Sequence, residues 1–302
     1  MAESSWQGRL GVCYSRYQGQ TCQRLTEVQA PFKLQRPFYP EGKHRCHGVV
    51  LHTAGGLVGG DRLELHATLE PGAEALLTTV AATKIYGPGR LTQGLGPIDR
   101  AAGSLGGGAA GSGGGTISPS SQQICWQLGA GCHGEWLPLE TIAYGGARHC
   151  QTVRVELGEG ATWLGWEILR LGRSAGGETF AGGEWRSRTE VWQQGRPLWI
   201  DPQWIPGEPE VLNGAQGLAG LPVVGTLAWV GQGIDRDGVE AVRRLWTGEF
   251  PAQGGVTRLE RGLLCRYRGR STAEARAWFQ LVWGLVRSWR GADRPVVPRV
   301  WP

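Results

Sequence analysis

The sequence predicts a mainly β protein built of stacked β layers, with about two α-helices toward its C-terminus. Glycine supplies 51 of the 302 residues and tryptophan 15, whereas only 19% of the residues are charged. This composition favours turn-rich β architecture over a helical bundle. Alternating apolar and polar residues recur in short runs between Gly-containing turns, and helical periodicity is confined to the C-terminal half.

The alternation that marks half-buried strands is clearest in two segments. Residues 63–69 read LELHATL and residues 153–157 read VRVEL, with an apolar side chain at every second position. Because successive side chains of a strand point to opposite faces, we expect one face of each strand to lie in the core and the other near solvent.

Three turn segments share the pattern Leu-x-x-Gly followed by a small residue, at residues 69–73, 128–132 and 157–161. Each leads into a further apolar strand, at residues 74–80, 135–137 and 163–166. The glycine supplies the positive φ that a tight turn requires. The turns recur 22 and 29 residues apart once the insertion described next is left out, which fits stacked layers. Chance recurrence in a Gly-rich β protein is the alternative.

Residues 87–123 form a stretch with 12 glycines and no aromatic residue. Such a segment cannot bury enough apolar surface to offset the entropy lost on ordering. Because β patterning of the same kind continues on both sides, we predict a single domain over residues 1–302, interrupted by a flexible insertion at about 87–123.

The clearest helix signal lies near the C-terminus. Ser271 and Glu274 have the spacing of a capping box, apolar residues follow at helical spacing up to Trp289, and Gly291 ends the pattern. A weaker second helix is predicted over residues 235–246.

The charge distribution and the chain ends bear on partners and compartment. The net charge of +5 is spread along the chain without Lys/Arg blocks, which argues against binding to nucleic acid or to a membrane surface. No signal-peptide pattern and no run of about 18 apolar residues is present, so we expect a cytoplasmic protein. The seven cysteines include no CxxC pair and are expected to be reduced thiols.

A Gly-rich motif stands before the first alternating strand; its residues are Gly55, Gly56, Gly59, Gly60, Asp61 and Arg62. The motif resembles a phosphate-binding loop, but no Gly-Lys-Ser/Thr follows and the chain continues as a strand rather than a helix. We therefore interpret it as a turn between strands in which Asp61 accepts hydrogen bonds from backbone amides.

Four potential ligands for Ni²⁺, Zn²⁺ or Cu²⁺ lie close together in sequence: His44, Cys46, His47 and His52. On an extended strand, His47 faces the opposite side from the other three, and the spacing is too long for the side chains to converge. We therefore predict ordinary strand residues and no tightly bound metal.

Catalytic motifs such as GxSxG and HExxH are missing, so no catalytic residue is assigned, although a triad assembled from distant segments stays open. Three acids stand in apolar or Gly-rich surroundings: Asp61, Glu140 and Glu167. Because burying an unpaired carboxylate is costly, each acid is expected either in an ion pair or capped turn, or on an internal passage for a cation.

Six stretches together resemble the UreD family of urease accessory proteins, also called UreH. They span residues 31–42, 52–62, 77–86, 135–142, 165–173 and 298–301, and the third contains the motif residues Lys84 and Tyr86. The chain departs from the family pattern at Ala54 and Val80, where proline is usual, at Leu139, and at Gly87, where the insertion opens.

The resemblance implies a helix-like stack of sheets without catalysis of its own. It also implies a cytosolic scaffold or chaperone that binds the urease apoprotein and UreF, with UreG joining through UreF, while nickel passes through an internal tunnel. No cofactor would then be tightly bound, because Ni²⁺ is in transit. The alternative function is a stand-alone nickel-storage or delivery protein that uses the cluster of His44, Cys46, His47 and His52. Dispersed carboxylates suit a conduit better than a Cys/His cage, which would trap the ion, so we assign nickel passage to Asp61, Glu140 and Glu167.

Overall fold

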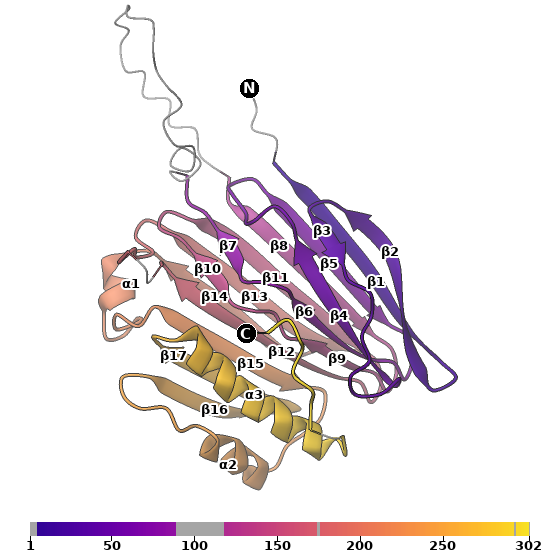
Figure 1. Ribbon diagram of the computed structural model, residues 1–302. Helices are drawn as coiled ribbons and strands as arrows, with labels where there is room; N and C mark the ends of the chain where they lie inside the picture. Colours follow the sequence, from indigo (N-terminus) through magenta and orange to yellow (C-terminus); the bar gives the residue numbers. More distant parts are fainter. Residues whose placement is uncertain (1–4, 89–117, 174–175, 293, 302) are drawn as a thin grey trace, which may run out of the picture.

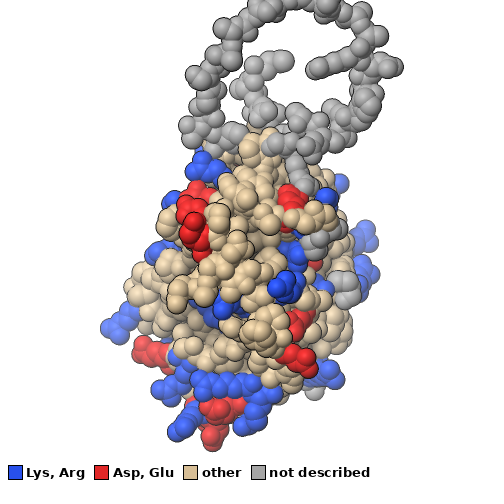
Figure 2. Space-filling view, turned by 90° about the vertical axis from the view of Figure 1, so that its left-hand side faces the viewer, with Lys and Arg blue, Asp and Glu red and all other residues tan. Residues whose placement is uncertain are grey.

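The computed structural model describes residues 5–88, 118–173, 176–292 and 294–301. Two β-sheets lie face to face, and a long helix covers the outer face of one of them (Figure 1). The prediction of a mainly β protein is therefore confirmed. Figure 2 shows one side of the molecule, on which basic and acidic side chains are interspersed.

The first sheet, sheet A, has seven strands. In spatial order they are β14 (Arg196–Pro206), β13 (Glu184–Gln193), β11 (Arg148–Leu157), β8 (Ser120–Leu128), β5 (Arg62–Leu69), β1 (Gln7–Tyr17) and β2 (Gln20–Gln29).

The second sheet, sheet B, has ten strands. Eight form a continuous path: β16 (Gln253–Leu259), β17 (Gly262–Gly269), β15 (Val223–Val230), β12 (Thr162–Leu171), β9 (His133–Trp136), β6 (Glu74–Thr79), β4 (Arg45–His52) and β3 (Phe32–Leu34). Two short strands extend it: β10 (Thr141–Ala143) pairs with β12 and with β7 (Thr83–Ile85).

The layered repeat is the central feature of the fold. Strands β5, β8 and β11 are parallel neighbours in sheet A, and the strands that follow them, β6, β9 and β12, are parallel neighbours in sheet B. The connecting turns contain Gly72, Gly131 and Gly160 with φ of +74°, +66° and +65°. These turns stack, since the Gly131 amide donates to the Glu159 carbonyl over 2.8 Å. Each predicted turn thus carries the chain from one sheet to the other.

Both predicted helices are present. Helix α2 (Arg236–Arg244) is capped by Asp235, and helix α3 (Thr272–Trp289) is capped by Ser271, whose side chain accepts from the Glu274 amide over 3.2 Å. A third helix, α1 (Pro209–Asn213), was not predicted, because five residues are too few to show a helical period.

The predicted insertion needs one correction at its C-terminal boundary. Residues 89–117 lie outside the described residues, but β8 already begins at Ser120 rather than after residue 123. The sequence Ser-Ser-Gln-Gln has no strand pattern of its own. It forms a strand because it pairs on both sides; Gln122, for example, lies between Leu63 of β5 and Gln151 of β11.

Candidate functional site: a polar hollow between the two sheets

Two neighbouring layers of sheet B each have a break between two strands, and the two breaks lie side by side. Strand β6 ends at Thr79 and β7 begins at Thr83, while β9 ends at Trp136 and β10 begins at Thr141. The neighbouring β12 runs without a break and pairs first with β9 and then with β10. The interrupted segments line two cavities that lie between the sheets.

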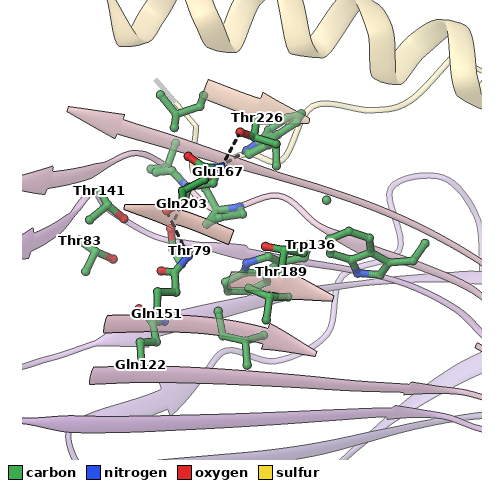
Figure 3. Close-up of a pocket in the computed structure, with 18 of the residues that line it drawn as sticks. Thr79, Thr83, Gln122, Trp136, Thr141, Gln151, Glu167, Thr189, Gln203 and Thr226 are labelled. Atoms are coloured by element: carbon green, nitrogen blue, oxygen red, sulfur yellow. Dashed lines mark hydrogen bonds between the residues drawn. The ribbon is translucent and has the colours of Figure 1, made fainter. Parts of the chain in front are cut away.

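The first cavity is narrow and polar, with a volume of about 40 Å³. Polar side chains from both sheets line it (Figure 3): Glu167, Gln122, Gln151, Thr189, Gln203 and Thr226. Because one buried water needs roughly 10–15 Å³ of such space, the cavity has room for a few water molecules.

The second cavity is larger, about 380 Å³, and lies on the side of the Gly-rich motif. His52, Gly55, Gly56 and Lys84 line it, together with the interrupted residues 80–82. The two cavities share four lining residues, Thr79, Thr83, Gln122 and Trp136. They are therefore adjacent parts of one hollow.

Glu167, on β12, is the predicted acid that lies in this hollow. Its Oε1 accepts a hydrogen bond from Gln151 Nε2 over 3.2 Å (Figure 3). Burial and the nearby Asp201 charge raise the pKa of Glu167 to about 7, although Ser187, Arg266 and Gln151 oppose the rise. The Glu167 carboxyl group therefore changes between its protonated and its ionised form near neutral pH.

A chain of polar contacts links the first cavity to Arg266 of β17. Gln203 Nε2 donates to Asp201 Oδ2 over 2.9 Å and to Thr226 Oγ1 over 3.2 Å. Arg266 donates to Thr226 Oγ1 over 2.7 Å and pairs with Asp201. Because the Arg266 side chain is 39% exposed, this chain reaches from solvent to the cavity wall and joins sheet A to sheet B.

Asp61 lies in a capped turn. The residue is 2% exposed, and its carboxylate accepts from the backbone amides of Trp6 over 2.8 Å and Val58 over 2.9 Å. This is the backbone-capping role expected for the Gly-rich turn. Asp61 does not line either of the two cavities, whereas Gly55 and Gly56 line the second.

The structure brings the Gly-rich motif together with Lys84 and Tyr86. The Leu57 amide donates to the Lys84 carbonyl over 2.8 Å, and the Tyr86 amide donates to the Leu57 carbonyl over 2.8 Å. Gly56 has a φ of +156°, and a Cβ there would lie 2.5 Å from the Tyr86 ring. Glycine is therefore required where the loop passes over Tyr86, which itself stacks on Tyr144.

Glu140 forms an ion pair with helix α3. Its Oε2 lies 2.9 Å from Arg276 Nη1, and it is not among the residues that line the two cavities. Asp61, Glu140 and Glu167 are thus placed in three different settings: a capped turn, an ion pair and a cavity.

The histidine and cysteine residues of the sequence cluster do not converge. His44 is exposed, Cys46 and His47 are buried, and His47 Nε2 lies 3.0 Å from Glu41 Oε1. His52 lines the second cavity. In the part of the chain that the structure describes, no group of three or more His, Cys, Asp and Glu side chains could hold a metal ion. All seven cysteines are free thiols.

The cavity glutamines were missed from the sequence, although a signal for them exists. Gln122 continues the inward positions of Ile124 and Trp126, and Gln151 continues those of Val153 and Val155. When the inward-facing positions of a strand change from apolar to polar residues, the interior of the protein becomes polar at that point.

One pair assembled from distant segments resembles part of a catalytic triad. Ser120 Oγ lies 2.9 Å from His149 Nδ1, but both residues are buried. His149 stacks on Trp185, and its Nε2 has no hydrogen-bond partner among the described residues. Without a carboxylate or access for a substrate, this geometry does not support a triad.

The buried histidines predict a pH dependence of stability. Burial lowers the pKa of His133 to about 4 and that of His149 to about 3, below the usual 6.5. Between pH 6.5 and 5 the unfolded chain therefore binds protons that the folded chain does not. As the pH falls through this range, the free energy of unfolding falls by up to about 1.4 kcal/mol per pH unit for each histidine. His149→Phe can keep the ring stacking on Trp185. It should remove the contribution of one histidine to the pH dependence of the free energy of unfolding, measured by urea unfolding at several pH values. Identical pH slopes for variant and parent would contradict this.

Comparisons with known proteins point to one family. The family model described as UreD urease accessory protein matches residues 7–302. The urease accessory protein UreD of Acaryochloris marina is 48% identical over 300 residues, which cover 99% of this chain and 96% of the relative. The UreD of a Nostoc strain is 47% identical over 98% of this chain and 96% of the relative. The UreD of Methylobacillus flagellatus is 33% identical over 99% of this chain and 95% of the relative.

Within the described residues, no helix is both long and apolar enough to cross a membrane.

Proposed function

Because the chain belongs to the UreD family of urease accessory proteins, we propose that it is a urease maturation factor through which nickel reaches the urease apoprotein. The observation that carries the nickel route is the hollow between the sheets, into which the Glu167 carboxylate faces. Nickel is cargo in this proposal and not a resident cofactor.

The chemistry of the first cavity suits an ion in transit. One carboxylate and several amide and hydroxyl oxygens can replace part of the hydration shell of a divalent cation, and the cavity has room for a few waters that keep the rest. Thiolate and imidazole ligands would hold nickel far more tightly. The dispersed His44, Cys46, His47 and His52 give no support to a storage protein.

The proposal extends to partners and compartment. We infer that the protein acts in the cytoplasm as a scaffold that binds the urease structural subunits and UreF, with UreG joining through UreF. The family name supports the link to urease, and the resemblance described above suggests the other two partners.

Deletion of the gene tests the maturation role. In the deletion strain we expect urease subunits at normal abundance but with little nickel, measured as metal per purified urease, and we expect a plasmid copy of the gene to restore the metal. Fully active urease in the deletion strain at ordinary nickel concentration would refute the role.

A further inference from the structure

A third hollow lies at the end of strand β12, away from the proposed nickel route. Its volume is about 320 Å³, and it shares no lining residue with the two cavities between the sheets. Arg173 and residues 177–181, between β12 and β13, line it together with the segment that contains α1. Ligand pockets of proteins begin at roughly 300 Å³, so this hollow has room for a small organic group.

The floor of this pocket is apolar. Leu171, Phe180 and Leu218 are buried side chains that line it, and Leu212 and Pro222 complete it. A bound group would therefore place an aliphatic or aromatic body against these side chains, away from water.

The lining is also rich in arginine, with Arg170, Arg173 and Arg270. Arg170 Nη1 donates to the Arg270 carbonyl over 3.1 Å, but Arg170 Nε is buried and has no hydrogen-bond partner in the described chain. A buried donor without a partner is costly, and this one belongs to an arginine that lines the pocket.

The positive charge of the pocket is only partly balanced. Glu178 is the single acid among the described lining residues; its Oε2 lies 3.9 Å from Arg173 Nε, and its Oε1 accepts from the Gly145 amide over 3.2 Å. Three arginines therefore face one carboxylate that already has partners. The pocket attracts an anion.

We propose that this pocket binds a carboxylate carried on a small apolar body, whether a free molecule or a side chain of a partner protein. The guanidinium group matches the planar geometry of a carboxylate, and the apolar floor suits the body behind it. The site is independent of the nickel route, because none of its lining residues lines the other two cavities.

Binding of phenylacetate, with phenylacetamide as the uncharged analogue, tests the proposal on the full-length protein by NMR titration. We expect the acid to bind at least about tenfold more tightly than the amide, since one charge-assisted hydrogen bond accounts for roughly that factor. Arg270→Gln and Arg173→Gln should each weaken the acid and leave the amide unchanged. Arg258→Gln, an exposed arginine of β16, makes the same change in net charge and should have no effect.

A second arm identifies the source of the carboxylate. If a partner supplies it, Arg270→Gln and excess phenylacetate will both reduce capture of urease subunits or UreF by the protein; if a free molecule supplies it, capture will be unchanged. Either result agrees with the proposal. Equal affinity for the acid and the amide, or unchanged binding of phenylacetate by Arg270→Gln and Arg173→Gln, would overturn it.

Discussion

Replacing Glu167 by glutamine is expected to lower the nickel content of urease about tenfold, while the variant still folds and still binds its partners. Among the described residues that line the first cavity, Glu167 is the only acidic or basic one, and its carboxyl carries a negative charge when it is ionised. Glutamine has the same shape and can still accept the hydrogen bond from Gln151. The substitution therefore removes the charge that attracts the cation and little else.

The measurement is nickel per urease after co-expression, with capture of urease subunits as a separate readout. Glu140→Gln is the matched control, because Glu140 also stands in an apolar stretch of sequence but is paired with Arg276. We expect the control to keep nearly the parental nickel content. Reduced nickel in Glu140→Gln with parental nickel in Glu167→Gln would refute a route through this cavity. Loss of partner capture in Glu167→Gln would make Glu167 a structural residue.

The layered fold could be predicted because its signals are local. A turn that needs positive φ marks itself with glycine, as at Gly72 and Gly131, and the cap of α3 lies within four residues of sequence. Each of these features depends on backbone geometry that a few neighbouring residues determine.

The setting of each acid could not be predicted in the same way. Asp61, Glu140 and Glu167 look alike in sequence, and their roles depend on partners far along the chain: Trp6 for Asp61 and Arg276 for Glu140. The hollow itself arises from two strand breaks at one level of the stack. Only the stacking of the layers brings these breaks together.

The same limit applies to the charged residues beneath α3, which the sequence did not single out. Arg287 of α3 is 0% exposed, and its Nε and Nη2 lie 2.5 and 2.7 Å from the two carboxylate oxygens of Glu135 on β9, 152 residues away in sequence. Its Nη1 donates to Glu41 over 2.7 Å. Burial alone would raise the pKa of Glu135, but Arg287 and the hydrogen bond with His133 lower it well below its usual range.

Arg287→Met is expected to reduce the free energy of unfolding by about 3–5 kcal/mol, the usual loss when one partner of a buried ion pair is removed. The methionine fills much of the space but leaves the Glu135 charge buried, with Trp283 Nε1 and His133 as its remaining hydrogen-bond partners among the described residues. Urea unfolding monitored by tryptophan fluorescence measures the loss. For a protein whose free energy of unfolding is about 10 kcal/mol, this loss is roughly a third to a half of the total.

Two further variants show whether the buried charge is the cause. Arg243→Met removes an exposed ion pair with Glu240 and a hydrogen bond from Arg243 Nη2 to the Val256 carbonyl. The side chains of Arg243 and Glu240 are 52% and 41% exposed, so the substitution should cost about 1 kcal/mol. The double variant Glu135→Leu with Arg287→Met removes both charges, while Glu41 keeps Arg45 and His47 as partners. It should therefore be more stable than Arg287→Met alone, because no carboxylate is left buried without its cation. A double variant less stable than Arg287→Met would show that packing of α3 on sheet B, and not the buried charge, accounts for the loss.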